Sequence, residues 1–121
     1  MKLYIAGPMR GIKWYNFPAF DKVRDRLIAA GYEVVSPADL DRAEGIDAMD
    51  LPEDYDWNKL PPGMELKHII IRDLTAMLEC DALAMLDGWT DSSGAWAESQ
   101  VAFWYGLIFR MVDEWESEVV V

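Results

Sequence analysis

Residues 82–88 read Ala-Leu-Ala-Met-Leu-Asp-Gly, an unbroken apolar run that ends at an acidic residue and a glycine. Such a run, bounded by turn residues, is typical of a strand that is buried on both faces of a parallel sheet. Helical spacing precedes it over residues 64–79, and a second helix is predicted over 94–105 with Gly106 as its stop. A further strand is predicted over 107–112, ahead of an acidic tail.

The amino-terminal part repeats the same alternation of strand and helix. Residues 3–6 form a short apolar run that Gly7-Pro8 closes, which is typical of a buried first strand. Asn16 is the predicted N-cap of the following helix, and Pro18 falls in its first turn. A second strand is predicted over residues 32–36.

Residues 38–63 break the pattern, because they are rich in acidic residues and prolines and show little periodicity. We interpret them as an acidic excursion or lid, and residues 1–121 as one domain. Strands that alternate with helices imply a parallel sheet covered on both faces. The predicted fold is therefore α/β, a three-layer single domain with about four to five parallel strands, of the flavodoxin- or Rossmann-like kind.

Composition limits the function classes. The chain has 121 residues and a formal charge of −11, from 22 acidic and 11 basic side chains. Such a surface repels a phosphodiester backbone, so we expect no nucleic acid polymer as a partner. Cys80 is the only cysteine and excludes an internal disulfide. The sequence has no signal-like or membrane-length apolar stretch, which predicts no membrane association and a cytoplasmic protein.

Ligands of parallel α/β sheets bind beyond the carboxyl ends of the strands. The first such end carries Gly7, Arg10 and Gly11, where glycines allow close approach of the backbone and the guanidinium can bind an oxyanion. A plain strand-to-helix turn with a surface arginine is an equally valid interpretation. Asp87, at the end of the run at 82–88, is the second candidate ligand contact.

The third region is Asp91-Ser92-Ser93-Gly94-Ala95-Trp96-Ala97-Glu98. Ser92, Ser93 and Gly94 precede a helix start, where free amides and hydroxyl groups can bind an anion. Glu98 lies one turn into that helix among small apolar neighbours, and partial desolvation there raises a carboxyl pKa. An ordinary N-cap followed by a first-turn glutamate is the alternative.

Asp73 flanks the apolar side of the helix at 64–79 and points either into a cleft or to solvent. Three tryptophans in loops near the predicted cleft, Trp14, Trp57 and Trp89, are candidates for stacking on a base. His68 is assigned no role, and the acidic run does not match a calcium loop. We therefore expect neither a metal nor a cofactor.

Taken together, four motifs resemble the nucleoside 2-deoxyribosyltransferase superfamily, which includes deoxynucleoside 5′-monophosphate N-hydrolases. They are Tyr-Ile-Ala-Gly-Pro at 4–8, Arg10-Gly11, Arg72-Asp73 ahead of Cys80-Asp81-Ala82, and Gly94-x-x-x-Glu98-x-x-x-Ala102. The resemblance implies that Glu98 is the nucleophile and that Asp73 holds the sugar or protonates the departing base. It also implies that Tyr4 lies near the nucleophile and that Ser92 and Gly94 bind a 5′-phosphate.

The expected function is therefore cleavage of the N-glycosidic bond of a (deoxy)nucleoside 5′-monophosphate through a covalent glycosyl-enzyme intermediate. Two alternatives stay open, a deoxyribosyltransferase that exchanges bases and a nucleotide-binding module without catalysis. The expected partner is a small-molecule nucleoside or nucleotide. The resemblance and the six tryptophans also lead us to expect a homodimer or larger homo-oligomer.

Overall fold

A computed structural model describes residues 1–117 of the chain. Within these residues one sheet is found, with four strands in the order β2-β1-β3-β4, and every neighbouring pair is parallel. The strands are β1 (Lys2–Ala6), β2 (Glu33–Val35), β3 (Ala82–Met85) and β4 (Ile108–Met111). The apolar run at 82–85 is thus a central strand, as predicted, and it is fully buried.

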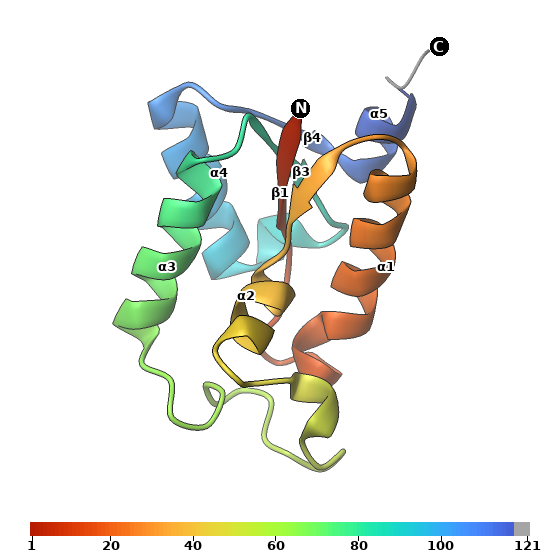
Figure 1. Ribbon diagram of the computed structural model, residues 1–121. Helices are drawn as coiled ribbons and strands as arrows, with labels where there is room; N and C mark the ends of the chain where they lie inside the picture. The colour runs from red at the N-terminus through yellow and green to blue at the C-terminus, as the bar shows by residue number, and fades with distance from the viewer. Residues whose placement is uncertain (118–121) are drawn as a thin grey trace.

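Helices cover both faces of the sheet (Figure 1). α1 (Phe17–Ala29) and α5 (Val112–Ser117) lie on one side, and α3 (Leu66–Leu78) and α4 (Ser93–Tyr105) lie on the other. This arrangement confirms the predicted three-layer α/β fold with a parallel sheet.

Alternate strand residues supply the two halves of the core. Leu3, Ile5 and Ala84 pack with the side chains of α1. Tyr4 and its register partner Leu83 face the other way and pack with residues of α3 and α4. The side chain of Tyr4 is therefore directed toward the face of the sheet that α4 covers.

The acidic excursion is more ordered than its composition predicts. It contains α2 (Pro37–Ala43) and a 3-10 helix, η2 (Ala48–Asp50). Ser36 caps α2, since its Oγ accepts a hydrogen bond from the Ala38 amide at 3.3 Å, and Pro37 occupies the first turn. A helix of two turns has too few apolar positions to show periodicity, which is why the pattern at 38–43 reads as loop.

Asn16 occupies the N-cap position of α1, as predicted, but it does not cap the helix with its side chain. Asn16 has a left-handed backbone with φ +62°, and its side chain makes no capping hydrogen bond. Its Nδ2 instead donates to the carbonyl of Pro8 at 2.9 Å. Trp14 and Tyr15 also have positive φ, within the 3-10 helix η1 (Lys13–Asn16), so this short segment bends sharply next to the loop after β1.

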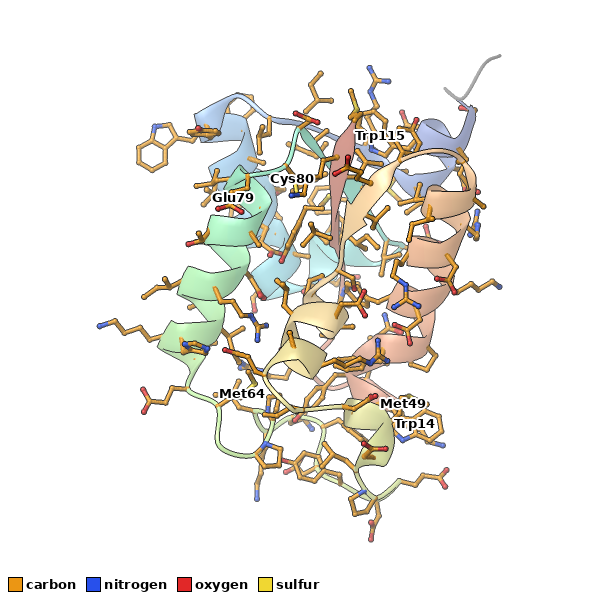
Figure 2. The ribbon with its side chains drawn as sticks, in the orientation of Figure 1. Trp14, Met49, Met64, Glu79, Cys80 and Trp115 are labelled. Atoms are coloured by element: carbon orange, nitrogen blue, oxygen red, sulfur yellow. The ribbon has the colours of Figure 1, made fainter. Side chains whose placement is uncertain are left out.

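The two ends of the sheet differ in what surrounds them. Glu79, Cys80 and Trp115 mark the amino-terminal end of the strands in Figure 2, whereas Trp14, Met49 and Met64 mark the opposite end.

Part of the predicted acidic tail forms α5, and residues 118–121 of that tail lie outside the described residues. Within residues 1–117 we find no helix that is long and apolar enough to cross a bilayer.

Candidate active site

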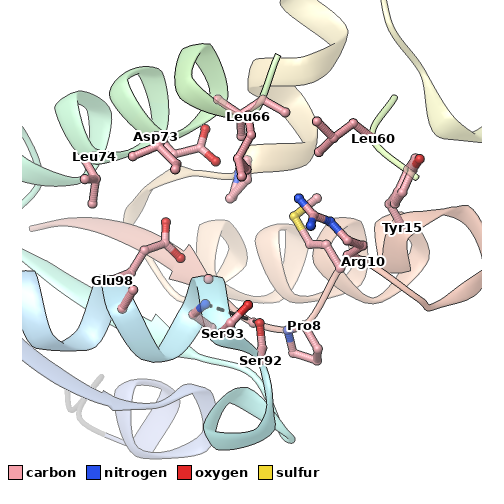
Figure 3. A pocket seen from close by; sticks show the side chains of 18 of the residues that line it. Pro8, Arg10, Tyr15, Leu60, Leu66, Asp73, Leu74, Ser92, Ser93 and Glu98 are labelled. Carbon is pink, nitrogen blue, oxygen red and sulfur yellow. Dashed lines mark hydrogen bonds between the residues drawn. The ribbon is translucent and has the colours of Figure 1, made fainter. Parts of the chain in front are cut away.

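A cavity of about 580 Å³ opens at the carboxyl end of the strands, and this volume is in the usual range for small-ligand sites. Its walls come from the loop after β1, from α2, from the segment after η2, from α3 and from the start of α4. Figure 3 shows how the side chains of these elements converge. The excursion thus covers part of the cavity, through Asn58, Leu60 and Pro61.

Glu98 lines this cavity from α4 and is only partly exposed. Its Oε2 accepts a hydrogen bond of 2.6 Å from the hydroxyl of Tyr4. Desolvation raises the pKa of Glu98 to about 8, while the Tyr4 hydrogen bond acts in the opposite direction and the charge of Asp73 adds to the rise. The environment therefore favours a carboxyl group that holds its proton near neutral pH.

Tyr4 lies fully buried in the middle of β1, beneath Glu98. Burial raises the pKa of its phenol well above the ordinary value, and the neighbouring carboxyl groups of Glu98 and Asp73 raise it further. The phenol consequently stays protonated and donates to Glu98. It fixes the orientation of the carboxyl group and does not act as a base.

Asp73 faces the cavity from α3, across from Glu98 (Figure 3). Its side chain is 14% exposed, and burial raises the pKa of its carboxyl group to about 6. The guanidinium of Arg72 opposes this rise, because its Nε donates to Asp73 Oδ1 at 3.0 Å. Two carboxyl groups with separately raised pKa values thus share one cavity.

Arg72 and Asp41 also line the cavity, and sequence reasoning gave neither a role. Arg72 donates to Asp41 at 2.7 Å and to Glu44 at 2.6 Å, in addition to its bond with Asp73. Both Arg72 and Asp41 are largely buried. The signal in the sequence was the Arg72-Asp73 pair itself, since a guanidinium beside a buried acid commonly orients it.

Three ligand contacts were predicted in the loop after β1, and two of them line the cavity while the third does not. Gly7 and Arg10 line the cavity, and Figure 3 shows the Arg10 side chain reaching into it. A Cβ on Gly7 would lie 2.6 Å from Cβ of Leu86, so this glycine is required for close packing of β1 on β3. Gly11 is not among the lining residues, and its amide donates to the carbonyl of Trp57 at 2.8 Å.

Ser92, Ser93 and Gly94 form one edge of the cavity at the start of α4. Ser92 is the N-cap, because its Oγ accepts from the Ala95 amide at 3.2 Å. A Cβ on Gly94 would meet no atom within 4 Å, so the backbone there borders open space. An N-cap and an anion site are compatible, since the capping hydroxyl keeps its own proton for a ligand.

Several predicted contacts lie elsewhere. Asp87 is exposed and lines a small separate hollow near Met111, because the chain after β3 turns away from the cavity. None of the three loop tryptophans is among the lining residues. Trp57 packs on Tyr15 and Tyr55, and Trp89 packs on Phe109, so both rings contact other aromatic side chains of the core.

In the described residues we find no group of three or more His, Cys, Asp or Glu side chains placed to hold an ion. His68 contacts Glu44 on the surface instead. Cys80 is buried at the far end of α3, and burial raises the pKa of its thiol to about 11, which keeps it in the unreactive thiol form.

The sequence was compared with known proteins and protein families. A search of curated proteins found no match. A family model described as "Domain of unknown function (DUF4406)" matches residues 1–112, which include the whole cavity. Because the match covers nearly all of the 121 residues, the chain belongs to the DUF4406 family.

Proposed function

We propose that this protein cleaves the N-glycosidic bond of a (deoxy)nucleoside 5′-monophosphate and releases the free base. One observation supports the proposal most strongly. Glu98 and Asp73 line the same cavity from two different helices, and the hydroxyl of Tyr4 donates a hydrogen bond to Glu98. The motif resemblance to the nucleoside 2-deoxyribosyltransferase superfamily assigns catalytic roles to the same three residues. The placement of these residues in the cavity and the motif resemblance are two separate observations that support the proposal.

The reaction would proceed in two steps. An oxygen of ionised Glu98 attacks the anomeric carbon, the bond from that carbon to the base nitrogen breaks, and its electron pair leaves with the base. Asp73 in its acid form supplies the proton that the base nitrogen takes up. Water then attacks the same carbon, gives its proton to Asp73 and frees Glu98, so the configuration is retained.

The cavity also offers separate surroundings for the two ends of a nucleotide. Arg10 and the Ser93-Gly94 backbone at the start of α4 supply positive charge and amide donors, which suit a phosphate group. Apolar side chains of α3 and α4, including Ile69, Ile70 and Val101, suit the flat faces of a base. The sugar would then lie between these regions, beside Glu98.

The proposal extends to the cellular location of the enzyme and to its oligomeric state. A 5′-phosphorylated substrate is a charged intracellular metabolite, so we propose that the enzyme acts in the cytoplasm. We also propose that it acts as a homo-oligomer.

The proposal is tested by incubating the protein with a panel of nucleosides and their 5′-monophosphates and measuring free base. We expect release from monophosphates, lost in Glu98→Gln and kept in Glu79→Gln, a matched change at an exposed glutamate far from the cavity. A second arm adds labelled free base. Incorporation of label without net sugar release would identify a transferase, and tight nucleotide binding without turnover in any arm would contradict the enzymatic proposal.

A further inference from the structure

The short helix α2 lies between α1 and α3 (Figure 1), and charged side chains connect it to both. On one side Arg42 donates to both carboxylate oxygens of Asp21 on α1, at 2.7 and 2.8 Å. On the other side Asp41 accepts a hydrogen bond of 2.7 Å from Arg72 on α3. α2 therefore holds a carboxylate against the same guanidinium that is bonded to Asp73.

The guanidinium of Arg72 is shared by three carboxyl groups. Its Nη2 lies 2.7 Å from an oxygen of Asp41 and 2.9 Å from one of Asp73. Its Nη1 lies 2.6 Å from an oxygen of Glu44. Asp41 is 6% exposed, and Arg72 and Asp73 are both 14% exposed, so water screens these charges poorly. One positive charge does not neutralise three negative charges, and the surplus favours a proton on one of the carboxyl groups.

Of the two more buried carboxyl groups, Asp73 is the one whose protonated form the surroundings favour. Burial raises the pKa of Asp73, Arg72 lowers it, and the negative charges of Asp41 and Glu44 raise it again. Burial also raises the pKa of Asp41, but two guanidinium groups, those of Arg72 and Arg42, lower it. With both beside it, Asp41 keeps its negative charge more easily than Asp73 does.

Other titratable groups also face this cluster. In the described part of the chain their side chains are hydrogen-bonded to partners other than Asp41. A substitution at Asp41 therefore changes the charge beside Arg72 while those bonds stay in place. These groups are Glu98 of α4, Tyr4 of β1, Tyr15 of η1 and His68 of α3.

We propose that Asp41 is a positioning residue, which holds Arg72 in place and thereby favours the protonated form of Asp73. Its effect on turnover rests on the proposed function, whereas its effect on Asp73 requires no substrate. Without the charge of Asp41, Arg72 pairs more closely with Asp73 and a repelling charge is gone, so both changes lower the proton affinity of Asp73. The arrangement that the reaction needs, with Glu98 ionised and Asp73 protonated, then becomes rarer.

The effect on Asp73 is measured without substrate by 13C NMR titration of protein labelled at the aspartate carboxyl groups, with the signal assigned from Asp73→Asn. In the wild type we expect Asp73 to titrate near pH 6. Asp41→Asn keeps an oxygen for Arg72 but has no charge, so it should lower this value by roughly half to one unit. Asp41→Glu carries the charge again and should return the titration toward the wild-type value.

Asp39→Asn is the matched control, because it makes the same change on the same helix. Asp39 bonds to Arg24 and Arg42 on the side of α1, and it does not line the cavity. Its substitution should leave the titration of Asp73 in place. Glu44→Gln is a second variant at a more exposed position, and it should move the titration in the same direction as Asp41→Asn, by less. Thermal melting checks that each variant is folded.

Activity separates a change of charge from damage to the structure. Below about pH 5 both carboxyl groups are mostly protonated, and the productive form depends on the ionisation of Glu98 alone. There kcat/KM of Asp41→Asn should equal that of the wild type. Between pH 6 and pH 8 the productive form also depends on the proton affinity of Asp73, so kcat/KM should be lower by roughly three- to tenfold.

Two results would overturn the proposal. One is an Asp73 titration that Asp41→Asn leaves unchanged, and the other is a loss of activity in Asp41→Asn that is equal at every pH. The first is independent of the proposed activity: if the titration moves as expected in a protein that releases no base, the N-glycosidase is wrong and the effect of Asp41 on Asp73 stands. Base release with an unmoved titration removes the role of Asp41 alone.

Discussion

At the scale of single residues, the proposed activity depends on which of the two carboxyl groups, Glu98 or Asp73, carries a proton. The proposed reaction requires Glu98 ionised and Asp73 protonated, yet burial gives Glu98 the higher pKa, about 8 against about 6. With that order, both groups are protonated below pH 6 and both are ionised above pH 8. Between these values the pair holds one proton, and the productive arrangement, with that proton on Asp73, is the less populated of the two.

A bell-shaped dependence of kcat/KM on pH follows from this pairing. We expect activity to rise up to about pH 6, to stay level, and to fall above about pH 8. Steady-state rates between pH 4.5 and 9.5 check this, with a deoxynucleoside beside the monophosphate, because a phosphate group itself titrates near pH 6. Activity that keeps increasing to the alkaline end would contradict a role for protonated Asp73.

Variants at two positions test which carboxyl group produces each limb of the pH profile. Tyr4→Phe removes the hydrogen bond that lowers the pKa of Glu98, so the alkaline limb should move to higher pH. Arg72→Met removes the charge that lowers the pKa of Asp73, so the acidic limb should move to higher pH while Arg72→Lys largely preserves it. A merely structural role of Arg72 would lower activity equally at every pH, with neither limb displaced.

Stability offers a test of the Glu98 environment without a substrate. Its folded-state pKa lies above the ordinary 4.5, so the native state binds this proton more tightly than the unfolded state does. The stabilising contribution is complete below about pH 4.5 and is lost as pH rises toward 8. Glu98→Gln should therefore gain stability over the wild type by on the order of 1 kcal/mol per pH unit in this window. Denaturant unfolding at several pH values measures it, and a constant difference would show that Glu98 is not desolvated.

At the scale of elements, the start of α4 combines a helix cap with a candidate phosphate contact. Ser92→Ala should reduce the free energy of unfolding by about 1 kcal/mol, since the Ala95 amide loses its acceptor. Ser92→Asp keeps an acceptor at the same position, so it should preserve stability and raise KM for the monophosphate more than for the nucleoside. Thermal melts and parallel kinetics separate the two effects, and equal changes for both substrates would place the phosphate elsewhere.

The elements differ in how well the sequence predicts them. β3 and α4 were predictable because an unbroken apolar run and a glycine stop are local signals. α2 was not, since its seven residues depend on the Ser36 cap and on packing against α1. The side-chain role of Asn16 was mistaken for the same reason: its hydrogen bond goes to Pro8, a contact set by the bend at Trp14 and Tyr15.

At the scale of the whole molecule, the parallel sheet brings residues 4, 73 and 98 together, although they are far apart in the sequence. Strand ends and helix faces have known directions in such sheets, which made Asp73 and Glu98 candidates, whereas Tyr4 was predicted only from the motif resemblance. Sequence reasoning also included Asp87 and Gly11, which follow strands but do not line the cavity: Asp87 is exposed, and the amide of Gly11 donates to the carbonyl of Trp57. It gave no role to Asp41, whose contact with Arg72 spans 31 positions.

The proposed reaction depends above all on Glu98 forming a covalent bond to the sugar. The direct measurement is rapid acid quenching of the enzyme during turnover of a deoxynucleoside 5′-monophosphate, followed by peptide mass spectrometry. We expect the mass of the sugar phosphate on the peptide that contains Glu98, and no such adduct in Glu98→Gln. Free base released at the wild-type rate by Glu98→Gln, without any adduct, would contradict the account.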